Sequence, residues 1–591
     1  MSLAVATLLL LGSLLAVGSP VKGEEENGMP SYGGTLVEGY LIEPKDLWLP
    51  MSSQNPARLM IHVYSGLIAM NHNLEPIPDL AYNWEISDDM LTYTFHLFDN
   101  VTWHDGVKFT SADVKFSYEK ILKPYHPEVS TYWTDFAELD RVDTPDDYTA
   151  VLHFKKKWAP ALIYMTVTHS TISPKHILEN LTVDEMKDPI KNPVYNKPIG
   201  TGPFKFVEWV RGSHIALERN PNYHRTDSHG NRLPYLDRYV VKFIPEPASL
   251  ILALVKGEID CVFTDFPIEY TDWAEAISGM KVQIGGDVWS YVTRLRCNLR
   301  EGPLSNKKVR QAISYAIDRE EILDKAQMGL GEPVSGPYGP IGSWAYNPDI
   351  GGTYYYDPDK ANALLDEAGY PRGADGKRFK IEILIKIGRP DEKAIAELTR
   401  DWLEDVGIEV EIKIQDFASF IDLLYVRWEF DIAIERQGAG ITPDYYAKFY
   451  TSDQIVRIGW RNAMGYNNSR IDELFQQGRE TLDREEHKEI YGEIQEILVE
   501  DLPDIYIYES MLIFAWKEEY TGYLLGTDEP GMPRCLLNGM FQSLAEVWWT
   551  GSPGTEVPTS PGVPVTYLAA PTVVAIIALV IAVYAVIKKP S

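Results

Sequence analysis

The sequence is poor in cysteine and lacks the short motifs that mark common enzyme classes. Only three cysteines, Cys261, Cys297 and Cys535, occur in 591 residues, and their spacing matches no zinc site. No glycine-rich nucleotide loop, metalloprotease histidine pair or nucleophile elbow is present. We therefore assign no catalytic residue, no metal and no cofactor, and we do not expect an enzyme.

Positive charge is scarce as well. Fifty-five Lys and Arg residues against 85 Asp and Glu give a formal net charge of −30, which argues against nucleic acid as a partner. An acidic, solvated surface is typical of an exported protein. The hydrophobic content of 45% indicates a folded body, and a chain of 591 residues is too long for one core, so two or more lobes are expected.

The N-terminal segment lacks the lysine or arginine that usually precedes a signal peptide's apolar run. Residues 3–17 nevertheless form such a run, and small residues follow it. We expect a signal peptide over residues 1–23, cleaved between Gly18 and Glu24, and a flexible lead over residues 24–34. No cysteine follows the run, so a bacterial-type lipid anchor is not expected.

The C-terminal segment contains a long apolar stretch, residues 568–587, of 20 nearly apolar residues. That length spans a bilayer, and Lys588 and Lys589 place the following tail, residues 588–591, in the cytoplasm. Residues 551–567 are rich in Gly, Pro, Ser and Thr and predict a tether. We expect a cell-membrane protein with an extracytoplasmic body, its N-terminus outside and one C-terminal transmembrane helix.

Export has consequences for two kinds of side chain. One disulfide is allowed outside the cell, and whether Cys261 and Cys297 pair stays open. Sequons begin at Asn100, Asn180 and Asn467, which makes glycosylation there a hypothesis.

Regular patterns run along the body. Residues 91–97 alternate as a strand, and Thr110 with Asp113 predicts a capping box that opens a helix. We interpret His104 in between as part of a turn rather than as a base or metal ligand. Further predictions are a helix over residues 56–67, a turn at residues 200–203, a strand–helix–strand unit over residues 379–414 with parallel strands, and a strand over residues 504–516.

Several stretches carry a family resemblance. LAYNWEISDDMLTYTFHL, WHDGVKFTSADVKFSYEKI, and PIGTGPFKFVEW followed by LERNPNYHR resemble, in this order, the oligopeptide- and dipeptide-binding proteins of ABC importers, solute-binding family 5. PLSNKKVRQAISYAIDREEIL adds to the likeness, which covers residues 35–545. A receptor with a C-terminal helix and no lipid cysteine resembles the archaeal version of this family.

The resemblance implies an α/β, two-lobed periplasmic-binding-protein-like fold with an enlarged, discontinuous first lobe. The first lobe would take residues 35–290, with a subdomain at about 61–195, and the chain would return to it over residues 509–550. The second lobe would take residues 291–508. Crossing segments at residues 289–298 and 509–516 would form the hinge, and the lobes would close around a ligand in the cleft.

The resemblance also implies ligand-facing loops. They carry our candidate ligand-binding residues: Ser53, Gln54, Tyr132, Trp133, Arg436, Gln437 and Asp444.

The loop ERQGAGITPDYY, residues 435–446, departs from the family pattern. Peptide-binding members carry a Trp and an Asp before a Pro-Asp pair, and that first Asp pairs with the peptide's ammonium group. Here Pro443 and Asp444 match, but Ala439 stands at the Asp position and Arg436 at the Trp position. An arginine there favours an acidic group or the hydroxyls of a sugar.

The sequence therefore predicts an extracytoplasmic receptor, with a monomeric body, that delivers oligopeptides or dipeptides to the transmembrane subunits of an ABC permease. An oligosaccharide receptor of the same class is the alternative, because the ammonium-binding Asp is absent. A surface hydrolase and a purely structural surface protein are further alternatives.

Overall fold

The computed structural model describes most of the chain between residues 30 and 549. Ser53, Gln54, Tyr132, Trp133 and Ala439 lie outside the described residues, as do the predicted signal peptide, tether and transmembrane segment. Within the part that is described, no helix is both long and apolar enough to cross a bilayer. The described residues are 30–48, 58–70, 75–122, 136, 138–167, 170–227, 229–263, 266–285, 290–340, 343–438, 442–457, 459–521, 545 and 547–549.

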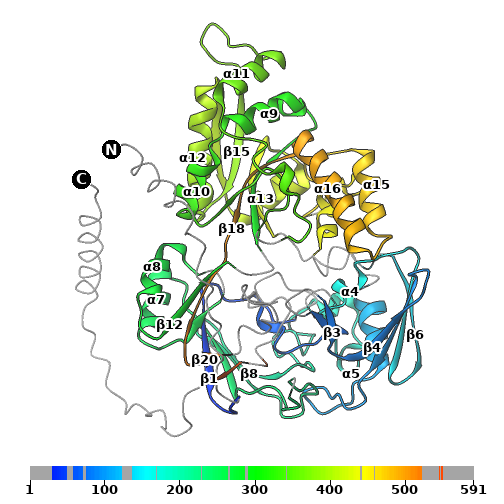
Figure 1. Ribbon diagram of the computed structural model, residues 1–591. Helices are drawn as coiled ribbons and strands as arrows, with labels where there is room; N and C mark the ends of the chain where they lie inside the picture. The colour runs from blue at the N-terminus through cyan, green and yellow to red at the C-terminus, as the bar shows by residue number, and fades with distance from the viewer. Residues whose placement is uncertain are drawn as a thin grey trace, which may run out of the picture. The chain divides into compact units, whose positions relative to one another are not determined.

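A seven-stranded sheet with the order β12-β19-β11-β1-β10-β9-β8 organises the first part of the chain (Figure 1). Strand β1 pairs in parallel with β10 and β11, and helix α7 packs against it. Apolar side chains of these elements form two core clusters. The elements are β1 (Thr35–Tyr40), β8 (Phe204–Val210), β9 (His214–Arg219), β10 (Arg238–Phe243), α7 (Pro247–Val255), β11 (Cys261–Val262), β12 (Met280–Ile284) and β19 (Ile513–Lys517).

A four-stranded antiparallel sheet, β4-β5-β7-β6, forms a second centre of packing. The predicted alternation is confirmed in β5 (Thr92–Leu97), whose inward side chains join a large aromatic core. The predicted capping box is confirmed too: the Thr110 N–H bonds to the Asp113 carboxylate at the start of α2 (Ser111–Phe116). The other strands are β4 (Ala81–Ile86), β6 (Leu139–Asp146) and β7 (Thr149–Phe154).

A six-stranded sheet, β14-β18-β13-β17-β15-β16, organises the second part. The predicted strand–helix–strand unit is confirmed, because β15 and β16 run parallel and α12 connects them. The strands are β13 (Tyr291–Cys297), β14 (Gly331–Pro333), β15 (Phe379–Lys386), β16 (Ile408–Gln415), β17 (Ile432–Gly438) and β18 (Asp504–Ser510).

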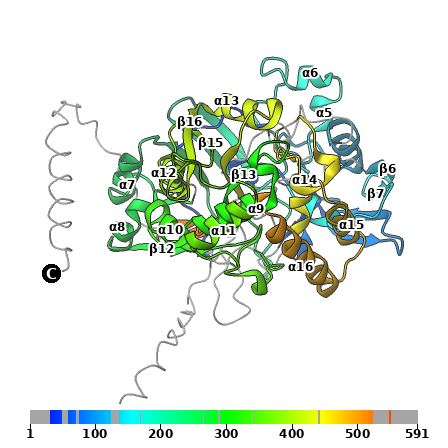
Figure 2. The ribbon, with the colours of Figure 1, turned by 90° about the horizontal axis from the view of Figure 1, so that it is seen from above.

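Two groups of helices accompany this second sheet; in Figure 2 the first group lies at the left and centre of the view and the second group at the right. The first group shares a core with the strands and consists of α9 (Lys307–Ala316), α10 (Arg319–Gln327), α11 (Pro358–Glu367) and α12 (Pro390–Asp405). The second group builds a tyrosine-rich cluster and consists of α14 (Ala447–Tyr450), α15 (Ser469–Gly478) and α16 (Arg484–Asp501).

The strand predicted over residues 504–516 is two strands in two different sheets. Strand β18 belongs to the six-stranded sheet and β19 to the seven-stranded one, with Met511 and Leu512 between them. The chain changes sheet in the opposite direction between the end of β12 at Ile284 and the start of β13 at Tyr291. An alternating pattern shows which side chains are buried but not which sheet buries them, so the change of sheet was invisible in the sequence.

The helix predicted over residues 56–67 is wrong beyond Met60, where a turn begins. The predicted turn at residues 200–203 is confirmed. It explains why the helix ends, because the turn forms hydrogen bonds with the backbone that the helix would have used. The N–H of Gly202 donates to the Val63 carbonyl at 2.9 Å, and a Cβ on Gly200 would lie 1.9 Å from that oxygen. Only glycine permits this approach, and hydrogen bonds across the chain replace those of a helix.

His104 holds the same turn from its other side. Its Nε2 lies 3.0 Å from the Gly202 carbonyl, and the Gly200 N–H lies 3.3 Å from its Nδ1. Burial lowers the pKa of His104 to about 4, so the ring is neutral at pH 7. A neutral ring with one donor and one acceptor fits both contacts, which makes His104 a structural group.

Cys261 and Cys297 are both buried and are free thiols rather than a disulfide. Burial raises the pKa of Cys297 to about 12, so its thiol stays protonated. Cys535 lies outside the described residues.

Candidate ligand-binding site

Tyr291 lies where the packing centres of the molecule meet. It is the first residue of β13, directly after the crossing from the seven-stranded sheet. Its side chain packs against the core of the four-stranded sheet, and Nη2 of Arg58, from the segment that follows β1, lies 3.3 Å from its hydroxyl. Because Tyr291 contacts groups from more than one packing centre, its contacts would change if the sheets moved relative to each other.

Arg436, one of the candidate residues, lies beside Tyr291. Its guanidinium carbon is 4.7 Å from the centre of the Tyr291 ring, within cation–π distance. The residue is half-buried, near the carboxyl end of β17. Among the described residues no hydrogen bond or ion pair engages its guanidinium.

Gln437 points to the other face of the same sheet, since successive residues of a strand alternate. It is buried, and its Nε2 donates to the Tyr445 hydroxyl at 2.7 Å. Its side-chain amide therefore fixes the segment that follows β17.

Asp444 is buried as well, with 4% of its surface exposed. Its carboxylate accepts from Nε of Arg479 at 2.7 Å, and the carbonyl of Arg479 accepts from the N–H of Ala159 at 2.8 Å. Burial by itself would lower the pKa of Arg479. The Asp444 carboxylate raises this pKa by more than burial lowers it, so it lies above its usual value. Asp444 therefore takes part in a chain of contacts from the segment after β17 to the segment after β7.

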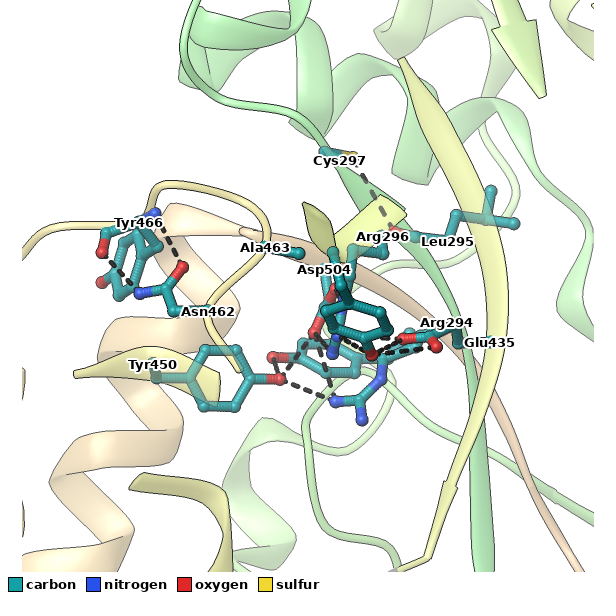
Figure 3. Close-up of polar contacts among 12 residues, drawn as sticks. Arg294, Leu295, Arg296, Cys297, Glu435, Tyr450, Asn462, Ala463, Tyr466 and Asp504 are labelled. Atoms are coloured by element: carbon teal, nitrogen blue, oxygen red, sulfur yellow. Dashed lines mark hydrogen bonds and ion pairs between the residues drawn. The ribbon is translucent and has the colours of Figure 1, made fainter. Parts of the chain in front are cut away.

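The structure also reveals a group of buried charges that the sequence analysis missed. Arg294 and Arg296 of β13, Glu435 of β17 and Asp504 of β18 lie together on the face opposite Arg436 (Figure 3). We call these four residues the buried quartet. Arg296 is 3.1 Å from Asp504 and 2.9 Å from Glu435, and Arg294 is 3.2 Å from Asp504.

Tyrosines add hydrogen bonds to the buried quartet. The Tyr450 hydroxyl donates to Asp504 at 2.8 Å, and the Tyr425 hydroxyl donates to Glu435 at 2.9 Å. Burial alone would raise the pKa of Asp504, but Arg296 and Arg294 hold it below its usual value. Two positive and two negative charges therefore persist together in the core. The signal in the sequence was the alternation of two arginines in TRLRC within an otherwise apolar strand.

Comparison with known proteins decides the family. A model of the bacterial extracellular solute-binding proteins, family 5, matches residues 75–455. The oligopeptide-binding protein AppA of Bacillus subtilis is 30% identical over 538 residues, which cover 88% of this chain and 95% of AppA. This chain belongs to solute-binding family 5.

The fold agrees with this membership. The structure of Bacillus subtilis AppA in complex with a nonapeptide is similar to the chain with a TM-score of 0.72 and 28% identity, over 88% of this chain and 100% of that one. The family 5 chain therefore has the two-lobed, mixed α/β architecture of a periplasmic binding protein. Heme-binding protein A of Haemophilus influenzae is also 30% identical, over 78% of this chain and 84% of its own, so the names of relatives at equal distance point to different ligands.

Proposed function

We propose that this family 5 protein is an extracytoplasmic receptor that binds oligopeptides or dipeptides between its two lobes and delivers them to an ABC permease. The observation that carries the proposal is the pair of single crossings, β12 to β13 and β18 to β19, that join two separate sheets. Two short connections at one place act as a hinge, and hinge closure around a ligand is how such lobes work.

The lobes are assigned as the sequence suggested, with residues 35–290 and 509–550 in the first and residues 291–508 in the second. The ligand would lie near Tyr291 and the end of β17. Ser53, Gln54, Tyr132 and Trp133 are further ligand contacts that the family resemblance implies. Anchoring through residues 568–587 would keep the receptor beside its permease, as the apolar composition of that segment suggests.

Calorimetric and thermal unfolding of the purified protein with a panel of peptides tests the proposal. A peptide at 100 times its dissociation constant should add about 2.7 kcal/mol to the free energy of unfolding. Mass spectrometry of the recovered peptide should find it intact, which separates a receptor from a hydrolase. A matched panel of oligosaccharides serves as the comparison, and stabilisation by sugars alone would replace peptide by sugar in the proposal.

A further inference from the structure

We propose that Arg436 forms a subsite for a carboxylate group of the bound solute. The inference rests on the proposed function, because it deepens the assignment of the same cleft: the ligand would be a peptide bound through its C-terminal carboxylate or through an acidic side chain. Arg436 would hold that carboxylate, with Tyr291 beneath the guanidinium.

The register of three strands places Arg436 in a polar row. Arg436 of β17 is paired with Thr293 of β13, and Thr293 is paired with Tyr508 of β18. Directly paired residues of antiparallel strands point to the same face of the sheet. The three side chains therefore follow one another across the face opposite the buried quartet.

Two members of this row are incompletely satisfied. The hydroxyls of Thr293 and Tyr508 are fully buried, and among the described residues neither makes a hydrogen bond of ordinary geometry. The side chains of Thr293 and Gln327 are close enough to the Tyr508 hydroxyl to oppose the rise that burial causes in its pKa. Buried polar groups are normally well paired, so two hydroxyls held only by loose contacts beside an arginine mark a polar place on this face of the sheet. Arg436 is the half-exposed member of the row, and a solute would meet it first.

The nearest carboxylates already have partners of their own. At the start of α12, Asp391 pairs with Arg389 at 2.7 Å and Glu392 with Lys386 at 3.0 Å. Burial raises the pKa of Asp391, while Arg389 and then Arg436 lower it to below its usual value, so Arg436 acts on Asp391 without forming an ion pair with it. Arg436 thus adds a positive charge to two pairs that are already neutral.

A second guanidinium approaches from the other lobe. Arg58 donates to the hydroxyl of Tyr291, while Arg436 lies over the ring of the same tyrosine. A protein with a net charge of −30 therefore brings two arginines to one tyrosine at the crossing of its lobes. The charge of Arg436, which forms no ion pair among the described residues, therefore favours a carboxylate over an ammonium group at this place.

The chemistry of arginine selects the class of ligand. Its planar fork offers two parallel N–H donors, which match the two oxygens of a carboxylate. The loop sequence agrees, because Ala439 replaces the aspartate that binds an ammonium group in the family pattern, and Arg436 stands three residues before it. This end of the site would therefore carry a positive charge, where the family pattern has a negative one.

The test uses the purified full chain and two matched sets of peptides. One set differs only in a free or amidated C-terminus, and the other only in Asp and Glu against Asn and Gln. Isothermal titration of the wild-type protein should show at least a tenfold loss of affinity in one of the two comparisons, and that comparison identifies the source of the carboxylate.

Arg436→Gln should abolish this preference, so that charged and neutral peptides bind equally, and Arg436→Lys should restore part of it. Arg457→Gln is the matched control, because Arg457 also lies over an aromatic ring, 4.3 Å from the centre of Trp428, without contacting Tyr291. Circular dichroism checks that each variant is folded. A wild-type preference retained in Arg436→Gln, or no preference in the wild type, would overturn the proposal.

A further arm separates this inference from the proposed function. If no peptide binds, thermal shifts with a panel of N-acetyl amino acids and their amides test the subsite directly. If the acids stabilise the wild-type protein and Arg436→Gln abolishes that stabilisation, the carboxylate subsite is retained and the peptide receptor is rejected. No shift with any acid would reject both.

Discussion

The two faces of the six-stranded sheet treat arginine in opposite ways. On one face Arg294 and Arg296 are fully buried, and the carboxylates of Asp504 and Glu435 neutralise them. On the other face Arg436 is half-exposed and lies over the ring of Tyr291, and among the described residues no carboxylate forms an ion pair with it. The same residue type, on neighbouring strands, is internally compensated in one place and left open in the other.

The difference separates structural charge from functional charge. A buried guanidinium without a counter-ion is very costly, so a charge kept in a core must come with its partners. A half-exposed guanidinium can stay solvated until a ligand arrives. The presence or absence of an ion-paired carboxylate beside each arginine, rather than its position in the sequence, therefore indicates which one can bind a solute.

The largest expected effect comes from opening the buried quartet. Asp504→Asn removes the carboxylate that both arginines share, and breaking a buried ion pair costs about 3–5 kcal/mol. Denaturant unfolding should show a loss of this size. Glu411→Gln is the control, because its pair with Lys380 at 2.6 Å is exposed to solvent and contributes little to stability. Equal losses in the free energy of unfolding of the two variants would contradict the distinction between buried and exposed charges.

His104 is a polar group whose two ring nitrogens both have partners, and it lies outside the six-stranded sheet. Its pKa of about 4 lies below the 6.5 of an ordinary histidine, so below pH 6.5 the unfolded state takes up a proton that the native state refuses. Stability is complete above pH 6.5 and falls as the pH drops toward 4, by about 3 kcal/mol in total.

Denaturant unfolding of wild type and His104→Asn at pH 7.5 and pH 5 measures this contribution. The penalty of the substitution should shrink by about 2 kcal/mol between the two pH values, because only the wild type loses the histidine contribution. A penalty that does not change with pH would mean that His104 is not neutral in the native state.

Arg436→Gln should change ligand affinity more than it changes stability. A cation–π contact at a partly exposed site contributes about 0.5–1 kcal/mol, so the free energy of unfolding should fall by no more than that. The affinity for a carboxylate-bearing peptide should fall at least tenfold, or about 1.4 kcal/mol in binding free energy. A loss of stability like that of Asp504→Asn, with no change in affinity, would place Arg436 among the structural charges.

Tyr291→Phe is the finest test. It removes the hydroxyl that meets Arg58 and keeps the ring that lies against Arg436. One hydrogen bond contributes about 1 kcal/mol, so unfolding should become easier by about that amount while the preference for carboxylates persists. Tyr291→Ala removes the ring too and should lose the preference. Identical behaviour of the two variants would show that the ring does not position Arg436.

Local order was predictable wherever neighbours in sequence decide it. The capping box of Thr110 and Asp113, the turn of Gly200 and Gly202, and the unit from β15 to β16 all follow from local hydrogen bonding and periodicity. The helix predicted over residues 56–67 failed because the glycine turn binds the same backbone from about 140 residues away.

The candidate site was predictable only in part. Arg436, Gln437 and Asp444 were chosen together from one loop, yet the structure turns Gln437 to Tyr445 and Asp444 to Arg479 and leaves Arg436 open. The binding roles of Ser53, Gln54, Tyr132 and Trp133 stay predictions, since these residues lie outside the described part of the chain.

By itself, the sequence determined the family, the acidic composition, and several helices, strands and turns, because these depend on residue type and on spacing along the chain. Tertiary structure alone decided that residues 504–516 divide between two sheets, that Cys261 and Cys297 stay apart, and which arginines are neutralised. The reason is physical: strand register and sheet membership bring together side chains that are more than 100 residues apart, and no local pattern records such contacts.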